Sequence, residues 1–295
     1  MVAEGYTGSI SFYHHPTVAV MIVGLVAWLS AGVLPADQDT PAAPPSRHEA
    51  ARLFFVGQYT ASAAMALQLR AQAPEDLSTF EQRTSSLHFQ LKRQLTADGM
   101  SKDKKKALRE CATCADMLSE LKADLVAGRA LAHARLAKDA GDTDAAFYLG
   151  KMDPTHVWLH NETLGQRTGW SEYREARRVL QEVLAKDPNH IRARVSHAWI
   201  DFIVDTRVPW AFRWVLGGGD KNRALATMRE TIAMPGSMEE RAEARFALWE
   251  MLARDKQIDE ARVIAGELAQ QFPENMELAR FLKLHPATTT GAPTR

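Results

Sequence analysis

The sequence predicts an all-helical fold built from stacked helical hairpins. Apolar residues recur at three- and four-residue spacing from about residue 48 to residue 284, which is the spacing of one helix face. Strand-like alternation is nearly absent over the same range. Three segments also repeat one order: a bulky residue, a small residue three positions later, and a proline twelve positions after that. Such internal repetition predicts one structural unit used several times.

The clearest of these segments runs up to Pro188. Tyr173, Ala176, Leu180 and Val183 fall on one face of a helix. A proline disfavours the helical conformation of the residue before it, so the helix is expected to stop just ahead of Pro188.

Two further segments and one looser copy share this order. Ala224 lies eleven residues before Pro235 in the looser copy. The two closer copies are Tyr59, Ser62 and Pro74, and Ile258, Ala261 and Pro273.

These segments resemble the second helix of the tetratricopeptide repeat (TPR) with its closing proline turn. The resemblance is carried by GWSEYREARRVLQEVLAKDPNH (169–190), RDKQIDEARVIAGELAQQFPEN (254–275) and GQYTASAAMALQLRAQAPED (57–76). In that family the small residue lets the two helices of a repeat approach closely. The resemblance is weak in the first helices, where the family's aromatic and glycine are mostly missing.

The resemblance implies a TPR-like α-α superhelix, which is a solenoid of helical hairpins. We expect about ten helices from the folded length. Pro188, Pro235 and Pro273 are separated by 47 and 38 residues, whereas a regular repeat has about 34, so the repeats are divergent. A generic helical bundle is the alternative.

An uncharged segment at 17–34 precedes the repeats. Its 18 residues suit a signal peptide or an N-terminal membrane anchor, and a buried core helix is the alternative. No Lys or Arg precedes it, which is unusual for an export signal. We divide the chain into four parts: an export segment or anchor (1–34), a proline-rich linker (35–47), the repeat domain (48–284) and a flexible tail (285–295).

Composition narrows the function. Lys and Arg together number 36, as do Asp and Glu, so no basic excess indicates a nucleic-acid partner. The basic run 102–106 is expected to begin a solvated helix. No nucleotide loop, paired-acid motif or Ser/His/Asp set is recognisable, so we expect no enzyme activity and no cofactor.

Cys111 and Cys114 form a C-x-x-C pair. Haem attachment requires a following histidine, but Ala115 stands there. A thioredoxin-like site needs a βαβ context, and zinc needs two more ligands. The pair is a candidate for a disulfide or a redox-sensitive site in an exported domain, and two separate thiols are the alternative.

The spacing of His156 and His160 places both imidazoles on one helix face. No third ligand is indicated, so a pair lining the concave groove is favoured over a metal site. We expect Arg194 and Trp199, which fall in another first helix, to line the same groove.

An unusual aromatic segment lies at 206–220, between two expected helices. We expect it to pack on the repeats as a flap, with Asp220 as the N-cap of the next helix. A partner surface is the alternative. The segment contains Arg207, Trp210, Phe212, Arg213 and Trp214, followed by glycines 217–219.

Stacked hairpins leave a curved groove, so the fold favours binding. The leading hypothesis is a protein- or peptide-binding scaffold of the bacterial envelope, either periplasmic or anchored to the inner membrane through 17–34. The second is a solute-handling component of a transport system, with a ligand cavity inside the repeats. An enzyme with dispersed catalytic residues is the third.

Overall fold

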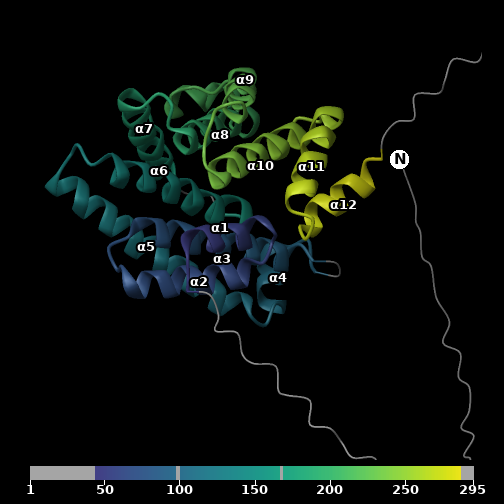
Figure 1. Cartoon of the computed structure of the whole chain (residues 1–295), viewed down its shortest axis with the longest axis horizontal. Helices are drawn as coiled ribbons and strands as arrows, with labels where there is room; N and C mark the ends of the chain where they lie inside the picture. Colours follow the sequence, from purple (N-terminus) through teal and green to yellow (C-terminus); the bar gives the residue numbers. More distant parts are fainter. Residues whose placement is uncertain (1–43, 98–99, 167–168, 287–295) are drawn as a thin grey trace, which may run out of the picture. The chain divides into compact units, whose positions relative to one another are not determined.

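The computed structural model describes residues 44–97, 100–166 and 169–286. Within these ranges the chain is helical and has no strand, as the sequence predicts (Figure 1). The apolar segment 17–34 lies outside them, as do most of the linker and tail. No helix in the described part of the chain is long and apolar enough to cross a membrane.

Twelve α-helices follow one another in the described ranges, together with one π-helical turn and one 3-10 helix. They are α1 (Arg47–Phe55), α2 (Tyr59–Gln72), α3 (Leu77–Leu95), α4 (Lys104–Glu110), α5 (Cys114–Lys138), α6 (Thr143–Trp158), the π-helical turn η1 (Leu159–Thr163), α7 (Trp170–Lys186), α8 (Ile191–Arg207), the 3-10 helix η2 (Trp210–Leu216), α9 (Lys221–Ile232), α10 (Met238–Arg254), α11 (Ile258–Gln271) and α12 (Met276–Leu284).

The helices pair as five hairpins: α1–α2, α3–α5, α6–α7, α8–α9 and α10–α11. Each hairpin packs on the next, and α12 packs on α11, so the architecture is a TPR-like superhelix (Figure 1). The predicted second helices are α2, α7 and α11. The small residues of the repeated pattern, Ser62, Ala176, Ala224 and Ala261, are all buried, as close helix approach requires.

Two insertions explain why the repeats are irregular. The short α4 interrupts the α3–α5 hairpin, and η2 interrupts α8–α9, which lengthens the interval between Pro188 and Pro235. The turn after η2 uses Gly217 and Gly218 at φ 80° and 79°, a conformation that L side chains rarely adopt. Asp220 then caps α9 by accepting a hydrogen bond from the backbone N–H of Arg223, as predicted.

The first and last hairpins meet, which a regular open solenoid does not require. The ring of Phe55 in α1 stacks on Phe246 of α10 at 5.5 Å and lies 5.6 Å from Phe272. Asn275 donates a hydrogen bond from Nδ2 to the backbone oxygen of Phe55 at 2.7 Å. Tyr59 donates to Glu277 of α12 at 3.4 Å. The curvature of the repeats therefore brings α1 into the same apolar core as α8 to α12.

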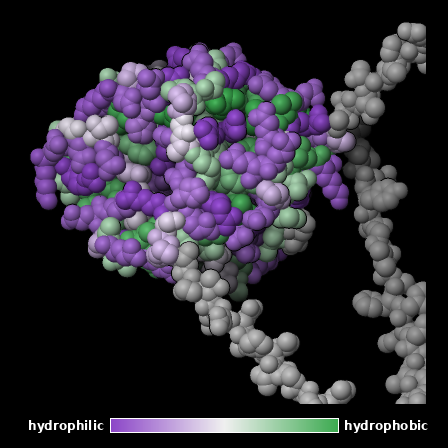
Figure 2. All heavy atoms as spheres, in the orientation of Figure 1, coloured by the Kyte–Doolittle hydropathy of each residue, from purple (hydrophilic) through white to green (hydrophobic). Residues whose placement is uncertain are grey.

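Hydrophilic residues dominate the face of the molecule seen in Figure 2, with hydrophobic residues scattered among them. The apolar side chains gather instead in two buried cores. One holds parts of α2 to α8 and the other joins α1 to the C-terminal helices. These cores stabilise the stack through burial of apolar area.

The contacts that join α1 to the C-terminal helices are called the closure below. Replacing Asn275 tests how much the closure stabilises the fold. Asn275→Ala removes the N-cap of α12 and leaves the buried Phe55 carbonyl without its donor. We expect a loss of about 2 to 4 kcal/mol in the free energy of unfolding, measured with urea.

Asn275→Ser retains an oxygen that can cap α12, but the serine side chain is too short to reach the Phe55 carbonyl. This variant therefore removes only the hydrogen bond of the closure. Asp220→Ala, which removes a cap away from the closure, is the matched control and should cost about 1 kcal/mol. Equal losses in Asn275→Ala and Asp220→Ala would show that the closing hydrogen bond adds nothing.

Candidate functional site

A cavity of about 880 Å³ lies inside the superhelix. Its walls come mainly from α1, α3, α6, α8 and α10, the first helix of each hairpin, which we call the inner helices. Its volume falls in the range of ligand-binding pockets. The cavity follows from the fold, because first helices face the concave side of a curved stack.

Aromatic rings form much of the lining. Trp158 and Trp199 meet edge to face at 5.8 Å, and Phe89 lies 5.3 Å from Phe54 and 5.6 Å from Tyr59. We call these residues and Trp249 the aromatic wall: Phe54, Tyr59, Phe89, Trp158, Trp199 and Trp249. Such rings offer a large apolar contact area for a ligand.

Four charged side chains from four inner helices form a closed network in the same lining. Arg192 of α8 donates to Glu81 of α3 at 2.9 Å and to Glu243 of α10 at 2.6 Å. Lys151 of α6 contacts the same two carboxylates, at 3.7 Å for Glu81. We call these four residues the four-helix network. Its two cations and two carboxylates balance, so it is formally neutral.

The network holds the Glu243 carboxylate in the ionised form. Burial would raise the pKa of Glu243, but the charges of Arg192 and Lys151 outweigh this effect and lower it to about 2. The same carboxylates raise the pKa of Arg192 well above its usual value, against the effect of its burial. Glu243 and Arg192 are therefore both charged at neutral pH.

A second charged group, the Lys92–Glu250–Arg254 triad, lies between α3 and α10. Arg254 and Lys92 approach the same oxygen of Glu250, Oε1, at 2.7 and 3.7 Å. The Arg254 guanidinium lies 5.6 Å from the ring centre of Trp199, and the Lys92 ammonium lies 5.5 Å from that of Phe89. The triad therefore adjoins the aromatic wall.

His88 is a neutral, buried member of the lining. Its Nε2 is 3.1 Å from the hydroxyl of Thr163 in the π-helical turn η1. Burial, assisted by the charge of Lys92, lowers the pKa of His88 to about 4. His88 thus acts at neutral pH as a hydrogen-bonding residue without charge.

Among the residues predicted from sequence to line the groove, Trp199 does so. The same expectation for His156, His160 and Arg194 is wrong, because they lie on other faces of their helices. His156 and His160 have ring centres 4.5 Å apart, and His156 faces Glu172 of α7 at 3.9 Å. Residues 150, 151, 154, 155 and 158 form the inward face of α6 instead.

Arg194 points away from the cavity toward α9. It pairs with Glu230 at 3.1 Å and donates to the hydroxyl of Thr231 at 3.1 Å. Binding of a partner by the two histidines or Arg194 stays a prediction. The described residues contain no group of three or more His, Cys, Asp or Glu side chains placed to hold a metal ion.

The expected packing of the aromatic flap is also wrong. The three aromatic side chains of η2 are exposed: Trp210 by 83%, Phe212 by 60% and Trp214 by 77%. Within η2 it is Leu216 that inserts into the core, and Arg177 holds the turn by donating to the carbonyls of Leu216 and Gly218.

Arg213, anchored on Asp205 and on the carbonyl of Val208, fixes the other side of η2. These polar contacts fix η2 with its large rings in solvent. A partner surface on these rings and the exposed Arg207 stays a prediction.

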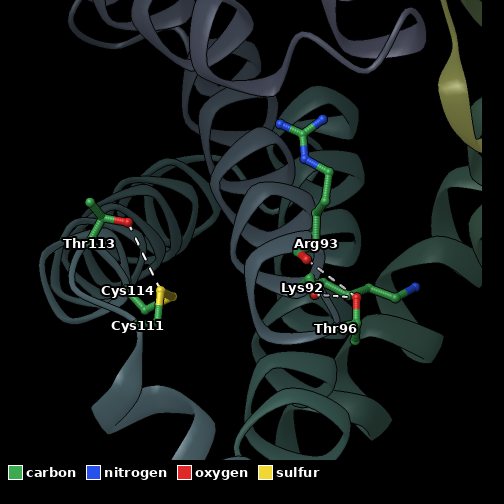
Figure 3. Close-up of a disulfide and its surroundings, with 6 residues drawn as sticks. All are labelled: Lys92, Arg93, Thr96, Cys111, Thr113 and Cys114. Atoms are coloured by element: carbon green, nitrogen blue, oxygen red, sulfur yellow. Dashed lines mark hydrogen bonds between the residues drawn. A yellow bond between two sulfur atoms is a disulfide. The ribbon is translucent and has the colours of Figure 1, made fainter. Parts of the chain in front are cut away.

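Cys111 and Cys114 are joined by a disulfide at the junction of α4 and α5 (Figure 3). Their Cα atoms are 5.4 Å apart, and Cys114 is fully buried. Figure 3 also shows the last turn of α3, where Thr96 donates to the carbonyl oxygen of Lys92. Because α3 packs on both α4 and α5, the disulfide braces the insertion beside this helix.

The fold assignment rests on how the helices of this chain pack, and comparison with known proteins adds little to it. No family model matches the sequence, and no curated protein matches it. Among solved structures, the crystal structure of a thermophilic TPR protein from Thermus thermophilus is similar. The two chains are 15% identical over 80% of this chain and 95% of the other, with a TM-score of 0.46.

Neutralising one carboxylate of the four-helix network should be costly. Glu243→Gln leaves Lys151 and Arg192 sharing Glu81, so we expect a loss of about 3 kcal/mol in the free energy of unfolding. Glu230→Gln is the matched control: its partner Arg194 is similar, but Glu230 is 71% exposed, so a loss below about 1 kcal/mol is expected. Similar losses in both variants would contradict a structural role for the network.

His88 should make stability depend on pH. Its pKa is about 4 in the folded chain and near 6.5 in the unfolded chain, so the unfolded state binds the proton more readily between these values. Stability conferred by neutral His88 is complete above pH 6.5 and is lost as pH falls, by up to about 3 kcal/mol at and below pH 4.

Urea unfolding of the wild-type protein and of His88→Gln, from pH 4 to pH 7.5, measures this loss. The difference between the two proteins should shrink toward acid pH. A difference that is constant across the range would exclude His88 as its source.

Proposed function

We propose that this protein is a non-catalytic binding module that holds a short segment of a partner polypeptide inside its cavity. The observation that carries the proposal is the cavity of about 880 Å³, walled by aromatic side chains of the inner helices. Pockets of this size accept a short segment or a drug-sized molecule, but not a folded domain. Aromatic residues are also the side chains most enriched at binding hot spots.

A role without catalysis is supported by the state of the lining carboxylates. Glu81, Glu243 and Glu250 each face at least one cation within 4 Å. The ion pairs lower the pKa values of Glu243 and Glu250. A carboxylate with a lowered pKa is a poor general acid, and a general base works best with a pKa near the working pH. The paired charges therefore suit a fixed binding surface better than proton transfer.

The closure of the superhelix favours a second candidate function, the handling of a small apolar solute. Contacts of Phe55 with Phe246, and of Asn275 with the Phe55 carbonyl, join the first and last hairpins. A cavity walled in this way shields an apolar ligand from water better than an open groove does. The apolar segment 17–34 supports the further proposal that either function is exercised at a bacterial envelope, with the domain exported or anchored.

Site-specific crosslinking in cells tests the first function. A photoreactive benzoylphenylalanine replaces Ser85, a lining residue of α3, in one variant, and Val263, 61% exposed on α11, in the matched control. We expect a discrete crosslinked partner from position 85 only, identified by mass spectrometry.

Two results would speak against peptide binding. Equal crosslinking from positions 85 and 263 would mean that contact is not confined to the cavity. No product from position 85, together with a small molecule released on denaturing the purified protein, would favour the solute-handling function instead.

A further inference from the structure

Three large aromatic side chains of η2 stand in solvent, away from the cavity. Trp210, Phe212 and Trp214 are exposed by 83%, 60% and 77%, and Val215 beside them is exposed by 38%. We call these four residues the η2 patch, and none of them belongs to the lining of the cavity. Exposed apolar patches of this kind mark sites of contact with a protein or a membrane.

The backbone that carries the η2 patch is held firmly, so the exposure of its rings is a fixed feature. Arg177 donates hydrogen bonds to the carbonyls of Leu216 and Gly218, at 3.2 and 2.7 Å. Nε of Arg213 donates to the carbonyl of Val208 at 3.0 Å, and Leu216 is buried. A contact made by such a preorganised segment loses less conformational entropy on binding than one made by a loose loop.

The rings of the η2 patch point in different directions. A 3-10 helix has three residues per turn, so Arg213 and Leu216 share the side of η2 that is anchored on the protein. Phe212 and Trp214 then fall on the two other sides, about 120° apart. A rigid partner surface can cover one of these sides, whereas a fluid layer of lipid chains closes around both.

The chemistry of the η2 patch also matches the surface of a bilayer. Tryptophan combines an apolar ring with a polar N–H group and is enriched where membranes meet water. Arg207, which is exposed at the end of α8, has a long side chain that can extend to lipid phosphates. Residues 206–219 contain no Asp or Glu, so no carboxylate within this segment opposes the phosphates.

The sequence ahead of α1 supplies a second, independent reason to expect a bilayer near this domain. Residues 17–34 are 18 uncharged residues, long enough to enter a bilayer. The twelve residues 35–46 connect this segment to α1. An extended chain spans at most about 3.5 Å per residue, so a membrane holding 17–34 stays within about 40 Å of α1.

We propose that the η2 patch dips into the surface of a phospholipid bilayer, with its rings among the upper acyl chains and Arg207 at the phosphates. Because η2 has seven residues, it lies within the interface and does not cross the membrane. This contact is separate from binding in the cavity. Its effect is to fix which side of the superhelix faces the bilayer.

Spin labels at two exposed positions test this contact. Ala211→Cys places the label in η2, and Val263→Cys places the control label on α11, where Val263 is 61% exposed. The introduced thiol is the only one that reacts, because the two native cysteines are joined by a disulfide.

The full-length protein is reconstituted with vesicles of phosphatidylcholine and phosphatidylglycerol. Power-saturation measurements by electron paramagnetic resonance then compare contact of each label with oxygen, which concentrates in lipid, and with a water-soluble nickel complex. We expect the vesicles to raise oxygen contact and lower nickel contact at position 211, and to change neither at position 263.

Substitution of the rings sharpens the test. In the protein labelled at position 211, Trp210→Ser combined with Trp214→Ser should abolish the effect of the vesicles, because the remaining apolar area is too small to enter the bilayer. Trp170→Ser removes a tryptophan of α7 that is 52% exposed and lies outside η2, so this matched control should retain the effect.

Three results would overturn the inference. The label at position 211 could stay open to the nickel complex in the presence of vesicles, or positions 211 and 263 could be shielded equally. Spin–spin broadening at position 211 without vesicles would assign the η2 patch to a second copy of the chain instead. Crosslinking at position 85 does not depend on η2, so the proposed function stands or falls separately.

Discussion

Four charged side chains, one from each of four successive inner helices, meet in the wall of the cavity. Arg192 bridges Glu81 and Glu243, and Lys151 contacts both carboxylates. These residues are separated by many positions in sequence, so their meeting fixes the rotation of α3, α6, α8 and α10 relative to one another. Removing one member leaves a charge without its partner in a partly buried site, which is costly. The network therefore constrains the curvature on which the cavity depends.

The closure between α1 and the C-terminal helices adds a further constraint on the shape of the cavity. Phe55 joins the apolar core of the C-terminal hairpins, and Asn275 both caps α12 and holds the Phe55 carbonyl. An open solenoid presents its inner face as a groove, but here the same face becomes the wall of a cavity. The neutral network is suited to holding the helices together.

The second helices of the repeats could be predicted from the sequence more fully than the residues that line the cavity. Buried Ala176 and Ala261, with the prolines that follow, are local signals because helix packing and helix termination act within a few residues. Trp199 was predicted to line the groove, and the recurrence of tryptophan in other first helices, at Trp158 and Trp249, is a signal in the sequence for the rest of the aromatic wall. The prediction for His156 is wrong because sequence periodicity shows which residues share a helix face, but not which face lines the cavity.

Local chemistry thus determined the helical hairpins, the capping of α9 by Asp220 and the glycine turn at 217–218. Tertiary structure alone decided the closure, the charge network and the exposure of the η2 aromatics. Apolar composition around Trp210 and Trp214 predicted burial, but Arg177 and Arg213 anchor the backbone so that the rings point outward. The physical reason is the same throughout: termination and capping depend on neighbouring residues, whereas burial and ion pairing depend on which distant helices share a face.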